Sequence, residues 1–163
     1  MKKTWITIFL TALMLTGCGA KDVFETLGNV LAEEGITAVR EIHMSLPDEA
    51  AVSSMEGQTG TIYLCDGYEI MVETLSAGDL NETIQTLTGF CREDLTIIQT
   101  QRDDLVCYEC VWSSAGESGD QVSRSVILDD GYYHYCVTFC AGAQDSGSLQ
   151  QQWQAIIDSI EAD

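Results

Sequence analysis

The side chains best suited to chemistry in this chain are one histidine and two cysteines in a short stretch: His134, Cys136 and Cys140. Imidazole and thiolate groups bind zinc, and thiols also carry redox chemistry. The stretch is typical of a β-strand, which places all three side chains on one face, opposite Tyr133 and Tyr135, which should face the core. Three ligands along one strand do not converge on an ion that needs four at about 2.0–2.3 Å. We therefore expect no metal and no cofactor, with these three residues as the strongest metal candidates.

Apart from Cys18 near the start of the chain, four further cysteines lie outside that stretch, at Cys65, Cys91, Cys107 and Cys110. Cys107 and Cys110 are three residues apart on a predicted strand, so they point to opposite faces about 10 Å apart. A disulfide needs Cα atoms within about 7 Å, and pairs with the cysteines of the last strand would span two strand spacings in a meander. Three alternatives stay open: mostly free, buried thiols, which we favour, disulfides through Cys65 or Cys91, or a metal.

No catalytic arrangement is evident from the sequence. Glu69 and Glu73 share a strand face, and Glu109 is a candidate for the same side, but paired carboxylates need a cleft that separates their pKa values. There is no glycine-rich phosphate loop, no Gly-x-Ser-x-Gly and no histidine near a candidate nucleophile. We therefore expect a protein that is not an enzyme.

Aromatic side chains offer a different kind of site, a binding patch. Its members would be Trp112, Tyr132, Tyr133, Tyr135 and Trp153. Strand alternation splits the tyrosines between two faces, so part of the set should be core.

The start of the chain has the features of an export signal. Lys2 and Lys3 precede an apolar run that ends at Leu15-Thr16-Gly17-Cys18 and is shorter than the roughly 20 apolar residues that a membrane span needs. This ending resembles the lipobox of bacterial lipoproteins, in which the cysteine becomes the lipidated first residue of the mature protein. The resemblance implies a signal peptide at 1–17, a lipid on Cys18 and a place on the extracytoplasmic face of the cell membrane. The alternative is an ordinary secretory signal.

Residues 18–21 would then be the lipidated tether, and residues 22–163 one globular domain. Removal of residues 1–17 takes away two of the seven basic residues and none of the 26 acidic ones, which leaves a net charge of −21. So large a negative charge repels nucleic acid and anionic lipid head groups, so we expect no nucleic-acid partner.

Apolar periodicity and turn residues predict an α+β fold, an antiparallel meander sheet packed against two or three helices in an α/β sandwich. Asp66-Gly67 suits a type I′ hairpin turn, and Asp79 and Glu82 with Gly89 bound a helix. The predicted strands are 38–46, 61–65, 68–75, 95–101, 105–112, 122–128 and 132–140. The predicted helices are 22–34, 79–88 and one that starts near Ser146 or Ser148. This order of elements over 38–163 resembles the Mog1/PsbP-like superfamily, a resemblance that implies a fold and no function.

These features favour a membrane-anchored extracytoplasmic module that binds or senses an unknown protein or small molecule. Its contact surface would be the exposed sheet face or the loops at 48–60 and 113–120. The alternatives are an accessory subunit of an envelope complex and a cysteine-dependent redox or metal protein.

Overall fold

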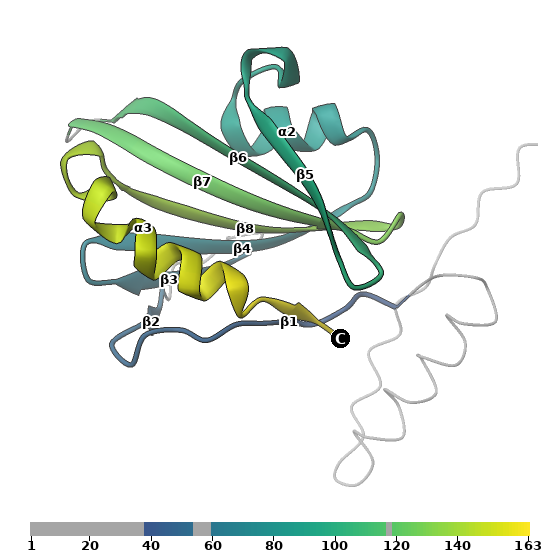
Figure 1. Cartoon of the computed structure of the whole chain (residues 1–163), viewed down its shortest axis with the longest axis horizontal. Coiled ribbons are helices and arrows are strands. Elements are labelled where there is room, and N and C mark those ends of the chain that lie inside the picture. The colour runs from purple at the N-terminus through teal and green to yellow at the C-terminus, as the bar shows by residue number, and fades with distance from the viewer. Residues whose placement is uncertain (1–37, 54–59, 117–118) are drawn as a thin grey trace, which may run out of the picture. The chain divides into compact units, whose positions relative to one another are not determined.

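The protein is described by a computed structural model over residues 38–53, 60–116 and 119–163, and residues 39–163 form one compact unit (Figure 1). The predicted signal peptide, the predicted lipidation site Cys18 and the predicted helix at 22–34 lie outside the described residues. No helix within the described residues is long and apolar enough to cross a membrane.

The unit is built on a seven-stranded antiparallel sheet with the strand order β2-β3-β4-β8-β7-β6-β5. Its strands are β2 (Ala51–Val52), β3 (Thr61–Cys65), β4 (Tyr68–Ser76), β5 (Ile97–Arg102), β6 (Leu105–Gly116), β7 (Gly119–Asp129) and β8 (Tyr133–Gly142). Strands β5 to β8 form the predicted meander, and β4 lies beside β8 because α2 and η1 carry the chain across the sheet. The predicted α+β class is confirmed.

The β3–β4 hairpin lies where the sequence predicts it, with Asp66 and Gly67 between the paired residues Cys65 and Tyr68. Its turn is not type I′, however. That type needs positive φ at both turn residues, and Gly67 has φ 79° while Asp66 is not among the residues with positive φ.

Two helices cover the two faces of the sheet. The side chain of Asp79 caps α2 (Leu80–Thr88) by accepting a hydrogen bond from the Asn81 amide, and Gly89 ends the helix with φ 76°, both as predicted. The last helix, α3 (Ala143–Asp158), starts earlier than predicted. The residues before Leu149 in this helix include no large apolar side chain, so the apolar periodicity that begins at Leu149 could not reveal its start.

Two other predictions about the strands are wrong. The predicted strand at 38–46 is only β1 (Ile42–His43), which pairs with β9 (Glu161–Ala162) in a separate two-stranded sheet. The predicted loop at 113–120 is the end of a hairpin, because β6 and β7 stay paired out to Gly116 and Gly119. Serine and glycine have low strand propensity, but the pairing register overrides it here. A short 3-10 helix, η1 (Arg92–Asp94), was not predicted.

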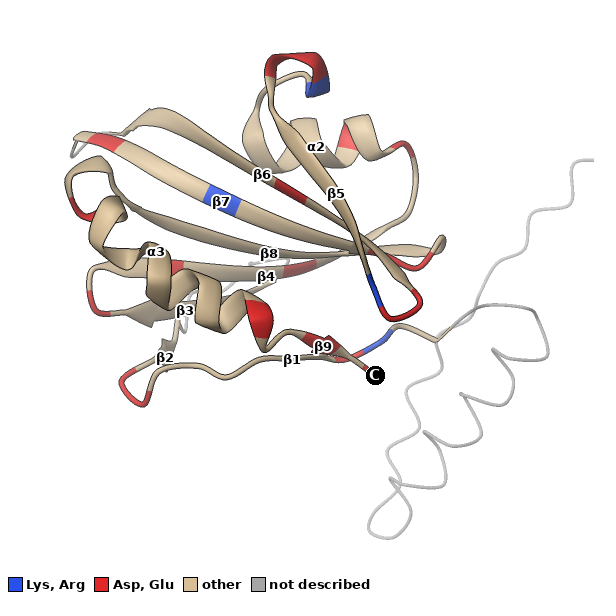
Figure 2. Cartoon of the chain, viewed as in Figure 1, with Lys and Arg blue, Asp and Glu red and all other residues tan. Residues whose placement is uncertain are grey.

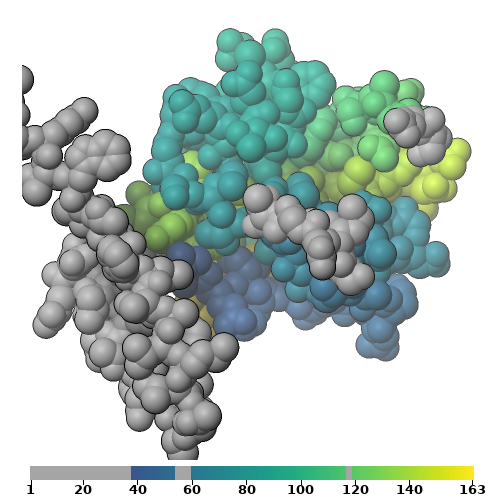
Figure 3. All heavy atoms as spheres, turned by 180° about the vertical axis from the view of Figure 1, so that it is seen from behind, coloured from purple at the N-terminus to yellow at the C-terminus, as the bar shows by residue number. Residues whose placement is uncertain are grey.

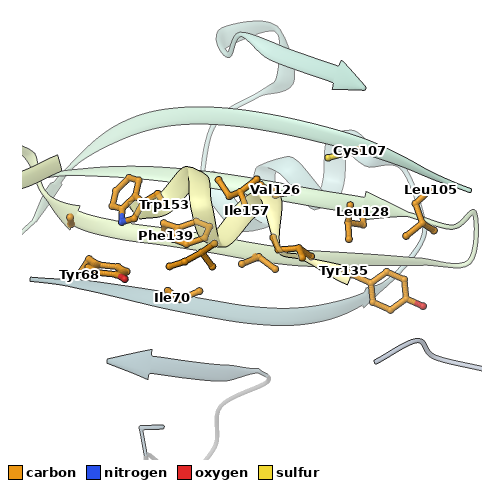
Figure 4. Packing of buried hydrophobic residues seen from close by; sticks show 14 residues of the cluster. Tyr68, Ile70, Leu105, Cys107, Val126, Leu128, Tyr135, Phe139, Trp153 and Ile157 are labelled. Carbon is orange, nitrogen blue, oxygen red and sulfur yellow. The ribbon is translucent and has the colours of Figure 1, made fainter. Parts of the chain in front are cut away.

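The main core lies between the sheet and α3. Figure 4 shows Trp153 and Ile157 of α3 against Ile70, Val126 and Phe139 of three central strands. The apolar stripe predicted for this helix is thereby confirmed.

A smaller cluster forms under α2 on the second face, around Ile84, Ile127 and Cys136. In the view from behind, α2 and η1 cover the upper part of that face (teal, Figure 3).

The start of the compact unit is fixed by Arg40. Its backbone amide donates to the Tyr135 hydroxyl (3.0 Å), and its guanidinium forms an ion pair with Asp104 and lies 3.9 Å from Asp130. Asp130 also accepts hydrogen bonds from the amides of Tyr132 (2.8 Å) and Tyr133 (2.7 Å) and from the Tyr135 hydroxyl (2.9 Å). The chain therefore enters the fold at the end of the sheet where the β5–β6 and β7–β8 turns lie (Figure 1).

Candidate functional site

The three metal candidates lie on the face of the sheet that α2 partly covers. The Nδ1 atom of His134 lies 2.7 Å from the Thr83 hydroxyl, and the Cys136 thiol donates to the His134 carbonyl at 3.7 Å. Cys140 is further along the strand, opposite Glu69. Within the part of the chain that the structure describes, no three histidine, cysteine or acidic side chains are placed to hold a metal ion.

The surroundings of His134 contain the residue types of a nucleophilic triad. Besides Thr83, the Asp129 carboxylate lies 3.7 Å from His134 Nε2. The His134 side chain is only 2% exposed and Thr83, on the buried side of α2, is only 5% exposed, so no substrate reaches the hydroxyl. The contact between Thr83 and His134 instead joins α2 to the sheet.

The six cysteines of the compact unit are all unpaired in the structure, and three of them, Cys107, Cys110 and Cys136, are buried. Burial raises the pKa of Cys110 to about 11 and that of Cys136 to about 12, and it also raises the pKa of Cys107. Thiols in these surroundings stay protonated at neutral pH, and only thiolates are nucleophiles. The geometry gives no support to cysteine-based redox chemistry at these three positions.

Alkylation of the native protein tests this arrangement of thiols. Iodoacetamide at neutral pH should modify the exposed Cys91 first and leave Cys107, Cys110 and Cys136 unmodified, as read by peptide mass spectrometry. All six should react once the protein is unfolded without a reductant. Thiols that stay unreactive in the unfolded, unreduced protein would show disulfides and contradict the free-thiol assignment.

The carboxylates do not form a shared site. Glu69 and Glu73 pair with Cys140 and Cys136, so they lie on the α2 side of the sheet, whereas Glu109 pairs with Val126 and lies on the α3 side. The suggestion that Glu109 lies on the same side as Glu69 and Glu73 is therefore wrong. Which face of the sheet Glu109 occupies depends on the register of β6 with β7, and the sequence alone does not reveal that register.

The predicted aromatic patch does not form either. Trp153 and Tyr135 are in the main core and Tyr132 is exposed at the β7–β8 turn, so the five side chains are split between interior and surface. The prediction from strand alternation that part of the set is core is confirmed.

α3 does not cover all of the sheet face on which it packs, and the part of that face formed by β5 and β6 is open. A pocket of about 250 Å³ lies there. Its lining residues come from the strands β5, β6 and β7, from the segment just before β5 and from α3: Thr96, Ile98, Glu109, Cys110, Val111, Arg124 and Gln150. We call this surface the α3 groove. Ile98 is 60% exposed and Val111 is 54% exposed, so two large apolar side chains face solvent within it.

A largely buried cation lines the α3 groove. Arg124 NH2 donates to Glu109 Oε2 (2.8 Å) and to Gln154 Oε1 (2.7 Å), and its side chain is only 14% exposed. Figure 2 shows this blue segment of β7 beside a red segment of β6. A guanidinium has five N–H donors, and Nε and NH1 have no hydrogen-bond partner among the described residues. An apolar concave surface with a few fixed polar groups is the usual form of a binding site.

The α3 groove was not predicted from the sequence. Ile98, Glu109 and Arg124 are far apart in the chain, and each looks ordinary in its own strand. The one available signal was that the predicted strand at 95–101 is apolar at its start and uncharged throughout, which is unusual for an exposed edge.

A second pocket, of about 240 Å³, lies at the β3–β4 hairpin, at the opposite end of the sheet from Arg40. Leu64, Glu69, Gln121 and Cys140 contribute to it. It contains no arrangement of side chains with a chemical role that we can assign.

No protein family known from sequence matches this chain, and no curated protein matches it either. Among solved structures, it is similar to the cyanobacterial PsbP protein (CyanoP) of Synechocystis sp. PCC 6803, with a TM-score of 0.54 and 7% identity over 90% of this chain and 98% of that one. This likeness shows the fold alone, and it agrees with the predicted PsbP-like order of elements.

Two other solved structures are similar. A protein of Bacteroides thetaiotaomicron gives a TM-score of 0.53 at 12% identity over 75% of this chain, which spans only 45% of that protein. LpqN of Mycobacterium tuberculosis, a protein involved in cell envelope biogenesis, gives 0.49 at 10% identity over 76% of this chain and 83% of that one.

Proposed function

We propose that this protein is a lipid-anchored extracytoplasmic module without enzymatic activity, and that it binds a partner through the α3 groove. The observation that supports the binding role is the groove itself, in which exposed Ile98 and Val111 adjoin the largely buried Arg124. Large apolar side chains that face solvent around a fixed polar group are typical of an interaction surface.

The anchor rests on the sequence around Cys18. Two acyl chains hold a protein stably at a membrane where one chain is marginal. From Cys18 to Val39, where the compact unit begins, the chain has 21 residues and can extend at most about 70 Å. That length is enough to let the module meet partners at the membrane surface.

Metabolic labelling tests the anchor. The wild-type protein should incorporate a labelled fatty acid, and Cys18→Ser should incorporate none and should be found unprocessed or released. The mature protein contains six other cysteines, so Cys91→Ser, at an exposed position, is the matched control and should be labelled as wild type. Labelled lipid on Cys18→Ser would contradict the lipobox assignment.

Co-purification from detergent-solubilised membranes of the source organism tests the contact surface. Val111→Lys places a charge in the middle of the α3 groove, and we expect it to reduce recovery of the bound partner at least about tenfold, equivalent to about 1.4 kcal/mol. Gln151→Lys adds the same charge at an exposed position of α3 outside the groove and should recover as much partner as wild type. Equal recovery with all three proteins would contradict the assignment of the groove.

A further inference from the structure

The two edges of the main sheet are very different. The edge strand β2 has two residues, whereas β5 at the other edge has six, Ile97–Arg102, and its four central residues are all exposed. The outward side of β5 forms no backbone hydrogen bond to any other described segment. An edge of this length is a template to which another strand can be added.

Natural edge strands usually carry features that prevent such pairing, and the four central residues of β5 have none of them. Proline, a bulge and an inward charge are the usual ones, together with lysine on the edge. The central residues of β5 are Ile98, Gln99, Thr100 and Gln101. Arg102, at its end, donates to the carbonyls of Ile157 (2.6 Å) and Ile160 (3.3 Å), so its charge is directed to the end of α3.

The unprotected edge borders the α3 groove. Ile98 belongs to both, since it lies on β5 and lines the pocket beside Glu109, its partner in the strand pair. A strand added to β5 lies about 4.8 Å from it, and alternate side chains of that strand point to the same face as Ile98. Those side chains would extend the apolar surface of the groove.

The charges around β5 indicate what kind of strand would pair with it. Exposed acidic pairs flank β5 at both ends, Glu93-Asp94 before it and Asp103-Asp104 after it (Figure 2). Arg92 is the exposed cation beside the first pair, and Arg40 forms an ion pair with Asp104 of the second, which leaves Asp103 as the carboxylate there without an ion-pair partner among the described residues. The chain as a whole has a net charge of −19. A second copy of this chain would meet strong repulsion, whereas a basic segment would be attracted.

We infer that β5 receives an extended segment of a basic partner protein, which pairs with its free edge and places alternate apolar side chains in the α3 groove. This inference rests on the proposed binding function and names the partner class for the same site. Main-chain hydrogen bonds would provide affinity, and the groove and the flanking carboxylates would select apolar residues in the centre and lysine or arginine at the ends.

The test uses the full chain in detergent micelles and a phage library of random 12-residue peptides. Selected peptides should share an alternating apolar pattern with basic ends. Hydrogen exchange should then show added protection of the β5 amides. Single backbone N-methylation of a selected peptide should weaken binding about tenfold or more at every second position only, because only those amides face β5.

Matched variants on the two edges complete the test. Ile98→Lys should reduce affinity about tenfold, whereas Val52→Lys, at an exposed position on the opposite edge, should change it less than twofold. Strand addition would be overturned if N-methylation at every position left the affinity of the selected peptides unchanged. If the same peptides still bound the Val111→Lys protein more weakly than wild type, binding in the groove would stand without strand addition. Enriched acidic peptides, or no enrichment, would also overturn the inference, while co-purification still tests groove binding separately.

Discussion

Trp153→Ala should lower the free energy of unfolding by about 3–5 kcal/mol, the usual cost of removing a buried tryptophan side chain. Trp153 is fully buried, and its ring lies 5.7 Å from that of Phe139 and 6.2 Å from that of Tyr68 between centroids. Neighbours on two strands would be left without their main contact on α3, which covers this part of the core (Figure 4). Urea unfolding followed by far-ultraviolet circular dichroism measures the change.

Trp153→Phe is the matched control, because it keeps a ring in the same place. The indole Nε1 has no hydrogen-bond partner among the described residues, so its loss removes a desolvation cost and no bond. We expect Trp153→Phe to cost less than about half as much as Trp153→Ala. Equal losses for the two variants would show that the indole N–H makes an essential bond and would contradict this description of the core.

Asp130→Ala should lower the free energy of unfolding by about 3 kcal/mol, since it removes one carboxylate that several groups share. The Asp130 side chain is 4% exposed, accepts from the amides of Tyr132 and Tyr133 and from the Tyr135 hydroxyl, and faces the Arg40 guanidinium. Its loss would leave these donors unpaired and release the chain where it enters the fold. Asp120→Ala, an exposed aspartate on β7, is the control for charge removal and should stay within about 0.5 kcal/mol of wild type.

The pH dependence of stability is an independent test of the role of Asp130. Burial acts to raise the pKa of Asp130, but the amides of Tyr133 and Tyr132, the Tyr135 hydroxyl and Arg40 outweigh it, so the pKa lies below its usual value. The contribution of Asp130 is complete above the unfolded pKa of about 3.9 and is lost as the pH falls through the folded pKa. Stability should therefore fall less steeply below about pH 4 in Asp130→Asn than in wild type. Parallel pH profiles for the two proteins would contradict this role.

Local signals in the sequence predicted much of the fold. The β3–β4 hairpin, the two ends of α2 and the meander depend on turn residues, capping residues and short connections, and these act over a few residues. The apolar stripe at Trp153 and Ile157 likewise predicted that α3 packs on the sheet.

Features set by distant contacts could not be predicted in this way. β6 and β7 continue through Ser113 to Gly116 because they pair with each other, against the propensity of those residues. Arg40 and Asp130 are 90 positions apart, and only the folded chain brings them together. The α3 groove was missed for the same reason, since it depends on which faces of β5, β6 and β7 align.

We propose that the α3 groove binds a partner at the cell surface. Site-specific photo-crosslinking in intact cells, with p-benzoylphenylalanine at Val111 and, as a control, at the exposed Gln151, tests it most directly. We predict a discrete crosslinked product from Val111 that is absent from Gln151 and is lost when Ile98→Lys is added. No product from Val111, or the same products from both positions, would contradict the account.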